Sequence, residues 1–388
     1  MIHTKNPYDL LSHKRFDVLI KYMYASNLSS EYYRNAYKEH LKVWNKFYEG
    51  EPKKRGFKDF DDAFKSIINN VVDEPVIVNS EGHLSNGAHR LASALFHQRP
   101  INIRNTNPDE NNLIGCDYKL FIKKGLSLHI LKRSALEYAK LKTNTHVICL
   151  FPIAHTRLNE VMDIINEHCN IFYHSSETLN SKGQLGLMKE IYFSDGWANE
   201  QGIQRKSDQC FVGKGNITFV LIDAKNLETV KEMKNRIRAL FNVGNHSVHI
   251  NDTHEETVRI AKTVFNDNSI HFINNRKNVS FPNYTKLMAD MKPDNNKVIT
   301  GSSVLSLYGL RDCKDIDLIY NVKPPIDSHN QYLKTFYRLT LDDIVNNPKY
   351  HLYYNGFKYA TLDVIKNMKK LRNEPKDRID VKLIESLK

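Results

Sequence analysis

The chain has 388 residues, of which 41% are hydrophobic and 10% aromatic, so the composition excludes a disordered chain and the length predicts two or three domains. Its 56 Lys and Arg residues exceed its 44 Asp and Glu residues by 12, which favours anionic partners such as nucleotides, phosphosugars or anionic glycolipids. No helix-turn-helix, zinc-finger or aromatic ribonucleoprotein motif accompanies the charge, so we do not expect nucleic acid as a partner.

Apolar stretches and cysteines bear on where the chain is expected to function. The longest apolar stretch, 146–154, is far shorter than the roughly 20 residues of a membrane-spanning helix. The first residues show no apolar signal core with a cleavage site. Five scattered cysteines form no CxxC pair, which argues against a disulfide framework or a zinc ribbon. We therefore expect a cytoplasmic protein without a transmembrane segment.

Residues 1–70 are predicted to form a helical N-terminal region. Apolar and aromatic residues recur at spacings of three and four across 29–50, which is the pattern of one helix face. The loop 51–56 ends this pattern, and a shorter helix is expected over 60–68.

Residues 71–142 are predicted to form a small α+β unit. Strands are expected at 76–80 and 101–105, with a turn and a helix over 85–96 between them. Gly87, His89 and Arg90 open this helix, where glycine allows the turn and arginine can hold a phosphate through two hydrogen bonds. This segment resembles the Gly-x-His-Arg turn of the ParB/sulfiredoxin-like fold, which implies that it binds nucleotide phosphates. The alternative is a helix start with solvated side chains.

Residues 143–285 alternate between strand and helix patterns, which is typical of an α/β domain with a largely parallel sheet. In chain order, the sequence predicts strands at 146–154, 170–176, 216–223, 246–252 and 269–275, and helices at 156–168, 226–241 and 253–265. The stretch 180–216 is rich in Gly, Ser and Asn, and we expect a long loop there.

Two strand ends of this α/β domain carry candidate functional residues. His155 and Arg157 follow the first strand, and His254 and Glu255 follow the strand 246–252. Ligands of open α/β sheets bind beyond such strand ends, so these four side chains are expected to converge on one cleft facing Asp315. For the second group, a capping box from Asp252 to Glu255 is the structural alternative to an acid–base role.

Residues 286–388 contain a candidate metal- and phosphate-binding motif. A strand (298–300) leads into Gly301, Ser302 and Ser303 and then a helix, and twelve residues separate Ser302 from Asp315. Glycine allows a ligand close to the backbone, and hydroxyl and N–H groups at a helix start can hold a phosphate. Strand alternation is expected to place Asp315 and Asp317 on one face, where two carboxylates could bind Mg²⁺ together with a polyphosphate.

This arrangement resembles the DNA polymerase β-like nucleotidyltransferase superfamily, whose signature is Gly-Gly/Ser, a spacer, and Asp-x-Asp/Glu between hydrophobic residues. Gly301, Ser302, Asp315 and Asp317 fit this signature, and Thr300 is a soft mismatch. In the tail 374–387, Lys376, Asp377 and Asp380 also match the helical ending of small members. The resemblance covers about the last 90 residues and implies a nucleotidyltransferase-like α+β domain that uses Mg²⁺ at a phosphate.

One feature departs from this family, whose active members usually have a third carboxylate on a later strand. The strand pattern 350–360 contains no acid, and Asp363 is expected to cap the next helix. Either Asp327 or Asp343 replaces the third carboxylate, or the site binds a Mg-diphosphate without nucleotidyl transfer. The structural alternative is a simple turn followed by a strand edge.

The sequence as a whole predicts a multi-domain, Mg²⁺-dependent transferase that uses a phosphorylated or nucleotide-activated donor. Nucleotidyl, phosphoribosyl or glycosyl transfer to a glycan or glycolipid would fit, and the resemblance implies a place in bacterial surface polysaccharide biosynthesis. Two other interpretations stay open. One is a small-molecule kinase centred on Gly87–Arg90, and the other is a non-catalytic nucleotide or nucleic-acid binding protein.

Overall fold

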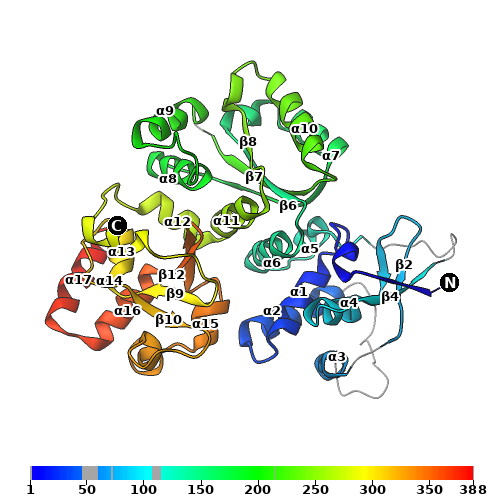
Figure 1. Ribbon diagram of the computed structural model, residues 1–388, viewed down its shortest axis with the longest axis horizontal. Coiled ribbons are helices and arrows are strands. Elements are labelled where there is room, and N and C mark those ends of the chain that lie inside the picture. Colours follow the sequence, from blue (N-terminus) through cyan, green and yellow to red (C-terminus); the bar gives the residue numbers. More distant parts are fainter. Residues whose placement is uncertain (1, 46–59, 71–72, 107–114, 214, 388) are drawn as a thin grey trace. The chain divides into compact units, whose positions relative to one another are not determined.

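A computed structural model describes residues 2–45, 60–70, 73–106, 115–213 and 215–387, and these residues form a mixed α/β structure (Figure 1). The chain forms two compact units. The first comprises Met1–Thr145, His168–His174 and Val220–Leu227, and the second comprises His146–Glu167, Ser175–Phe219 and Glu228–Lys388. The boundaries between the units run through strands of the middle sheet.

The first unit contains a four-stranded sheet in the order β1-β4-β2-β3. Its strands are β1 (Ile2–Lys5), β2 (Val76–Val78), β3 (Leu84–Asn86) and β4 (Ile101–Asn105). β1 is antiparallel to β4, and β2 is parallel to it. The predicted segments 1–70 and 71–142 therefore share one sheet, because the N-terminal residues supply its edge strand.

Helices of the first unit pack around aromatic side chains. They are η1 (Pro7–Leu10), α1 (Asp17–Ser26), α2 (Glu31–Asn45), α3 (Phe60–Asn69), α4 (Ala88–Phe96), α5 (Tyr118–Lys123) and α6 (Leu128–Leu141). Tyr37, on the predicted face of α2, is fully buried and stacks on Tyr24 with 5.2 Å between ring centroids. The predicted loop 51–56 and the end of the predicted first helix lie outside the described residues.

The middle sheet has the order β6-β7-β5-β8. Its strands are β5 (Thr145–Leu150), β6 (Asn170–Glu177), β7 (Ile217–Asp223) and β8 (Val248–Ile250). β8 pairs antiparallel with β5, with Ile148 opposite Ile250 and Leu150 opposite Val248. For this pair the expectation of parallel strands is wrong, because the turn before β8 brings the chain in beside the end of β5, so that β8 runs back along it.

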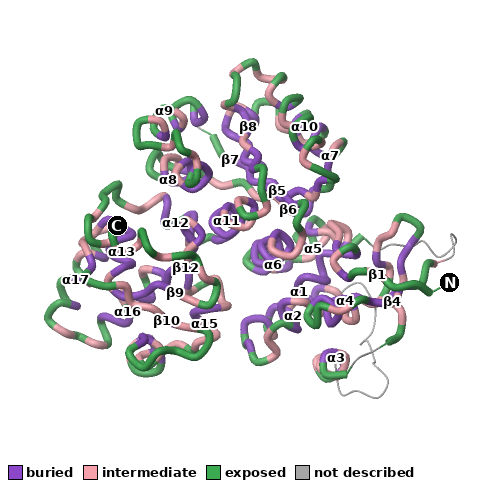
Figure 2. Tube along the Cα trace, viewed as in Figure 1, coloured by how far each residue is buried: buried purple, intermediate pink, exposed green. Residues whose placement is uncertain are grey.

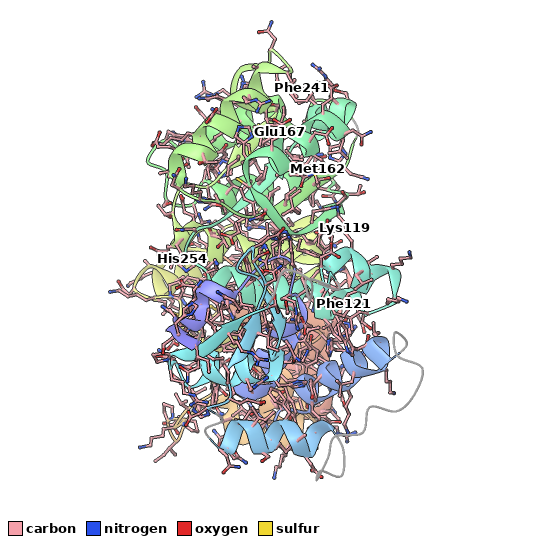
Figure 3. All side chains as sticks on the ribbon, turned by 90° about the vertical axis from the view of Figure 1, so that its right-hand side faces the viewer. Lys119, Phe121, Met162, Glu167, Phe241 and His254 are labelled. Carbon is pink, nitrogen blue, oxygen red and sulfur yellow. The ribbon has the colours of Figure 1, made fainter. Side chains whose placement is uncertain are left out.

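The helices around this sheet are η3 (Pro152–Arg157), α7 (Leu158–His168), α8 (Ser181–Ile191), α9 (Glu200–Cys210), α10 (Leu227–Ala239), η4 (Gly244–His246), α11 (His254–Val264) and α12 (Asp267–Asn275). α7 and α10 are linked by an ion pair of 2.8 Å between Glu167, labelled in Figure 3, and Arg236.

Two predictions for this region are wrong. The expected loop 180–216 contains α8 and α9, because Asn180 and Asn199 each cap a helix through the side-chain oxygen. The expected strand 269–275 is part of α12, which Asn266 caps in the same way. A short apolar run is compatible with either a strand or a helix, and here the side-chain cap at Asn266 favours the helix.

The C-terminal sheet has the order β10-β9-β12-β11. Its strands are β9 (Lys297–Thr300), β10 (Asp317–Tyr320), β11 (His351–Tyr354) and β12 (Phe357–Ala360). Asn355 and Gly356 form the β11–β12 turn with φ of +49° and +78°, a conformation that Asn and Gly tolerate best. The predicted strand-rich piece 350–360 is therefore a hairpin.

The helices of this region are α13 (Pro282–Ala289), α14 (Ser302–Leu307), η5 (His329–Tyr332), the π-helical turn η6 (Leu333–Tyr337), α15 (Leu341–Asn346), α16 (Leu362–Arg372) and α17 (Pro375–Glu385). The predicted order of strand, glycine turn, helix and strand over 298–320 is confirmed, as are the two terminal helices.

Burial differs between the strands (Figure 2): every residue of β5 and of β11 is buried, whereas no residue of β1 is. All five cysteines are buried and free, as their spacing predicts. Among the described residues, we find no helix whose length and apolar content would allow it to cross a membrane.

Candidate functional site

The turn between β9 and α14 brings the backbone against a carboxylate. Gly301 has φ +64° and ψ −142°, a conformation that only glycine adopts readily. A Cβ atom added there would lie 1.9 Å from Oδ2 of Asp317. Any side chain at position 301 would therefore collide with Asp317, and the glycine is required by both backbone conformation and space.

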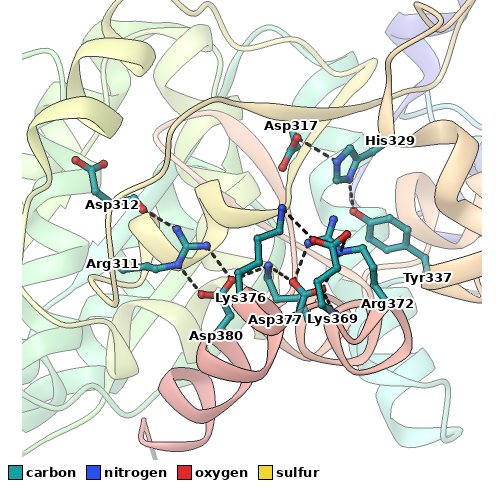
Figure 4. A network of polar contacts seen from close by, with 11 residues as sticks. Arg311, Asp312, Asp317, His329, Tyr337, Lys369, Arg372, Lys376, Asp377 and Asp380 are labelled. Carbon is teal, nitrogen blue, oxygen red and sulfur yellow. Dashed lines mark hydrogen bonds and ion pairs between the residues drawn. The ribbon is translucent and has the colours of Figure 1, made fainter.

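Asp317 is held in place by its strand and by one histidine. It is the first residue of β10 and lies opposite Thr300 of β9. Its Oδ1 lies 3.0 Å from Nε2 of His329, and the other ring nitrogen, Nδ1, lies 2.7 Å from the Tyr337 hydroxyl (Figure 4). That hydroxyl is 2.8 Å from Oγ1 of Thr300. Asp317, His329, Tyr337 and Thr300 thus form a closed chain of polar contacts around the strand end.

The protonation state of Tyr337 follows from its surroundings. Burial raises the pKa of Tyr337 above that of an ordinary phenol. The hydroxyl therefore keeps its proton at neutral pH and donates to one of its two neighbours.

Asp315 differs from Asp317 in its surroundings. It precedes β10, so strand alternation does not define its direction, and its side chain is exposed. Its backbone carbonyl accepts a hydrogen bond of 3.1 Å from Oγ of Ser303. Within the described ranges, the Asp315 carboxylate forms no ion pair. Strand alternation through Asp315 and Asp317 predicts that Ile316 and Leu318 point into the core, but both are half-buried and the buried residue of this strand is Ile319.

The loop before Asp315 is fixed by neighbouring helices. Oδ1 of Asp312 accepts from the backbone N–H of Tyr284 at 2.9 Å, and Oδ2 accepts from that of Asn283 at 3.1 Å, so Asp312 caps the start of α13. Asn283 also donates to the carbonyl of Cys313. These hydrogen bonds fix the loop that precedes Asp315 and Asp317.

A second group of charged residues lies at α16 and α17 (Figure 4) and is fully paired. Asp380 accepts from Arg311 at 2.5 Å and from Lys369 at 2.7 Å, and Asp377 accepts from Lys369 at 3.1 Å and from Arg372 at 2.7 Å. Both carboxylates are buried. Burial alone would raise the pKa of Asp377, but its hydrogen bonds from Arg372 and Lys369 hold that pKa at about 2.

We name Arg311, Lys369, Arg372, Asp377 and Asp380 the α16–α17 ion network. The predicted match at 376–380 thus places two acids in the interior, whereas Lys376 is exposed and pairs with Glu374.

The candidates for a third metal carboxylate lie elsewhere. Asp343 belongs to a capping box with Thr340 at the start of α15, and Asp327 is exposed in the loop after β10. The cap of α16 is Thr361, so the expected capping role of Asp363 is wrong; Asp363 lies in the first turn. Over the part of the chain that the structure describes, no three His, Cys, Asp or Glu residues are grouped as a metal site.

His329 and Tyr337 were not predicted as part of the site. They lie in two consecutive short turns, His329 in η5 and Tyr337 in η6, so no hydrophobic period marks them. A histidine twelve residues after Asp317 was the only signal in the sequence.

The residues present fit a metal that keeps part of its own coordination shell. Mg²⁺ commonly binds one or two carboxylates and takes its remaining ligands from water and from substrate phosphates. Asp315 is unpaired, and Asp317 has only His329 as an ionic neighbour among the described residues. These two side chains could hold Mg²⁺ that arrives with a polyphosphate.

The turn at 86–90 lies in the first unit, and its side chains already have partners. Gly87 has φ +102°, and an added Cβ would lie 2.6 Å from Cγ1 of Val76. Nε2 of His89 lies 2.8 Å from the Tyr37 hydroxyl. Arg90 pairs with Glu74 at 2.5 Å. Phosphate binding by His89 and Arg90 stays a prediction, and it would require both to exchange these partners.

The expected convergence of the two strand ends in the middle region is wrong. His155 and Arg157 follow the end of β5, where the N–H of Phe151 donates to the carbonyl of Ser247. His254 and Glu255 follow the end of β8, which lies beside the start of β5. Because these strands are antiparallel, the two pairs of residues lie at opposite ends of the sheet.

The residues at each of these two strand ends have contacts in their own neighbourhood. His155 Nε2 lies 3.2 Å from Oγ1 of Thr218, and burial lowers the pKa of His155. Arg157 pairs with Glu160. The capping box of α11 joins Thr253 and Glu256, one residue later than expected from Asp252 and Glu255.

Comparison of the chain with protein-family models gives no match, and comparison with curated protein sequences gives none either.

Proposed function

We propose that the chain is a Mg²⁺-dependent transferase acting on a phosphate- or diphosphate-activated donor at Gly301, Asp315 and Asp317. One observation carries the proposal: the Asp317 carboxylate lies against the backbone of Gly301, and the exposed Asp315 side chain, two residues earlier, forms no ion pair among the described residues. Two carboxylates that no described Lys or Arg neutralises suit a metal and the phosphate that it carries.

Each residue has a distinct part in this proposal. Asp315 and Asp317 would hold Mg²⁺, which when bound neutralises charge on a phosphate. Gly301 lets the Asp317 carboxylate lie against the backbone at the start of α14. His329 is a positioning residue, because it orients Asp317 and is itself fixed through Tyr337.

The donor class follows from the number of carboxylates. Two carboxylates leave several Mg²⁺ positions for donor oxygens, so a nucleoside triphosphate, a nucleotide sugar or phosphoribosyl diphosphate would each fit. The excess of 12 positive charges favours an anionic donor. A glycan or glycolipid acceptor in surface polysaccharide synthesis is the accompanying proposal, and it rests on the family resemblance alone.

A thermal-shift screen tests the donor. Each of the three donor types is added with and without Mg²⁺ to the full chain and to Asp317→Asn. A ligand at a hundred times its Kd stabilises the folded state by about 2.7 kcal/mol and so raises the melting temperature. We expect a Mg²⁺-dependent rise for at least one donor, absent in Asp317→Asn. The proposal is wrong if no donor raises the melting temperature, or if the variant responds like the parent.

A second candidate function is donor binding without turnover. The observation that favours it is that His329, rather than a third carboxylate, lies beside Asp317. Release of the donor's leaving group supports transfer: pyrophosphate from a nucleoside triphosphate or phosphoribosyl diphosphate, or the nucleoside phosphate from a nucleotide sugar. Mg²⁺-dependent binding without any product supports this second candidate.

A further inference from the structure

A cavity of about 530 Å³ lies in the second unit, on the far side of the C-terminal sheet from Asp317. Tyr359 lines this cavity and lies opposite Ile299 of β9. Asp317 lies opposite Thr300, the next residue of β9. Since successive side chains of a strand point to opposite faces, the cavity and Asp317 are on different faces of the sheet. The site of the proposed transfer does not account for this cavity.

Aromatic side chains form the wall and the mouth of the cavity. The hydroxyls of Tyr284 and Tyr359 lie 3.1 Å apart in its wall, and Tyr354 lies beside them. At the mouth, Phe193 is 53% exposed and Val279 is 45% exposed. Large apolar side chains that remain in water around a hollow are typical of a ligand site.

Positive charge gathers at one end of the cavity. Lys189 and Arg276 line it, and they also line a neighbouring cavity of about 220 Å³ that contains Lys182. Nζ of Lys189 donates to Oδ1 of Asn278 at 3.0 Å, and the Arg276 guanidinium lies 5.3 Å from the centroid of the Tyr354 ring.

These two cations have no acidic side chain in direct contact. Within the described ranges, neither Lys189 nor Arg276 forms an ion pair with an acid. Burial, and then the charge of Arg276, lower the pKa of Lys189, and the more distant charge of Glu200 opposes them only in part. An anion bound between the two cations would relieve their repulsion.

One residue that lines the cavity carries an unsatisfied acceptor. Oδ1 of Asn355 is buried and has no hydrogen-bond partner among the described residues, although the backbone N–H of the same residue donates to Glu190 at 2.6 Å. A buried acceptor without a donor costs free energy, so a ligand N–H or O–H at this position would be stabilising.

We propose that this cavity binds a nucleotide, with the base against Tyr284 and Phe193 and the phosphate between Lys189 and Arg276. The volume lies within the range of small-molecule sites. Aromatic walls stack on any flat base, and an exocyclic amine or a ribose hydroxyl can donate to Asn355. This site is independent of the proposed transfer at Asp317 and needs no metal.

Calorimetric titration of the full chain in EDTA tests the proposal, with AMP, GMP, CMP and UMP as probes and adenosine and inorganic phosphate as partial ligands. We expect at least one nucleotide to bind more tightly than either partial ligand. Removing a charge-assisted contact by Lys189→Met should weaken nucleotide binding by about tenfold or more. The same change should leave adenosine binding within about twofold, because adenosine carries no phosphate.

Matched variants test whether nucleotide binding depends on the cavity or on other parts of the molecule. Lys231→Met removes an exposed lysine of α10 and should bind nucleotide like the parent. Phe193→Ala should weaken adenosine and nucleotide alike, by about fivefold or more, because it removes stacking. Asp317→Asn should not change binding in EDTA, so failure of the transfer proposal leaves this test intact. The proposal is overturned if no nucleotide binds, or if Lys189→Met and Lys231→Met bind it equally.

Discussion

Two groups of carboxylates in the C-terminal region differ in how they are paired. Asp377 and Asp380 are buried and accept hydrogen bonds from Arg311, Lys369 and Arg372. Asp317 has one histidine as an ionic neighbour, and Asp315 is exposed and unpaired among the described residues. In the first group, Lys and Arg side chains neutralise the carboxylates. In the second group, no described Lys or Arg does so, and the negative charge can interact with a ligand or a metal.

This difference separates a structural role from a binding role. A buried carboxylate that loses its cations is strongly destabilising, so the α16–α17 ion network is expected to hold the two terminal helices together. Carboxylates that no described Lys or Arg neutralises contribute less to folding and can take a metal with its substrate. We therefore expect large stability effects in the first group and large ligand effects in the second.

The largest stability effect is expected for Asp377→Asn. The change leaves Lys369 and Arg372 without their full counter-charge, and breaking a buried pair in this way costs about 3–5 kcal/mol. Urea unfolding measures the loss. Lys376→Gln is the control: this neighbour is exposed and, among the described residues, pairs only with Glu374, so we expect a change within about 0.5 kcal/mol. Equal effects of the two changes would show that buried and exposed charges of α17 contribute alike.

The pH dependence of the same variant sharpens this prediction. The pKa of Asp377 is about 2 in the folded chain, below its ordinary value of 3.8. Its contribution to stability is therefore fully present above its unfolded pKa and is lost as pH falls through about 2. The parent should lose about 2 kcal/mol more than Asp377→Asn over this range. Parallel pH profiles would contradict the ion-network assignment.

A smaller stability effect is expected where the site meets the backbone. Gly301→Ala places a methyl group against Asp317 in a backbone conformation that alanine disfavours, which should cost roughly 3 kcal/mol. Gly244→Ala is the matched control, with φ +59° and no atom within 4 Å of the added Cβ. Strain alone should cost about 1–2 kcal/mol there. Similar costs at both glycines would show that Asp317 does not crowd Gly301.

The smallest stability effect is expected for Asp315→Asn. The side chain is exposed and forms no ion pair with the described residues, so the free energy of unfolding should change by less than about 0.5 kcal/mol. Thermal unfolding without metal measures it. A loss of several kcal/mol would give Asp315 a structural role like that of Asp377.

The sequence predicted the local elements of the C-terminal region well. The glycine turn at Gly301 and the strand pattern over 350–360 were predicted, because both depend on neighbouring residues only, whereas the Asn355-Gly356 signal for a hairpin was not used. The amphipathic face of α2 placed Tyr37 in the core for the same reason.

Features that depend on distant residues were not predictable in this way. The direction of β8 is set by pairing with β5, about a hundred residues earlier, and no local pattern encodes it. The contact between His329 and Asp317 joins a short turn to a strand end, and no periodicity in the sequence marks it. The helices α8 and α9 were mistaken for a loop because Gly and Ser outweighed the Asn caps at Asn180 and Asn199.

Mn²⁺ binding, followed by electron paramagnetic resonance with Mg²⁺ competition, tests the central claim most directly. The full chain is titrated with Mn²⁺ in the presence of a donor from the screen, alongside the double variant Asp315→Asn/Asp317→Asn and the control Asp363→Asn. The two site carboxylates are proposed to hold the metal, so the double variant should lose binding at least about tenfold while the control binds like the parent. Unchanged Mn²⁺ binding in the double variant would contradict the proposed metal site.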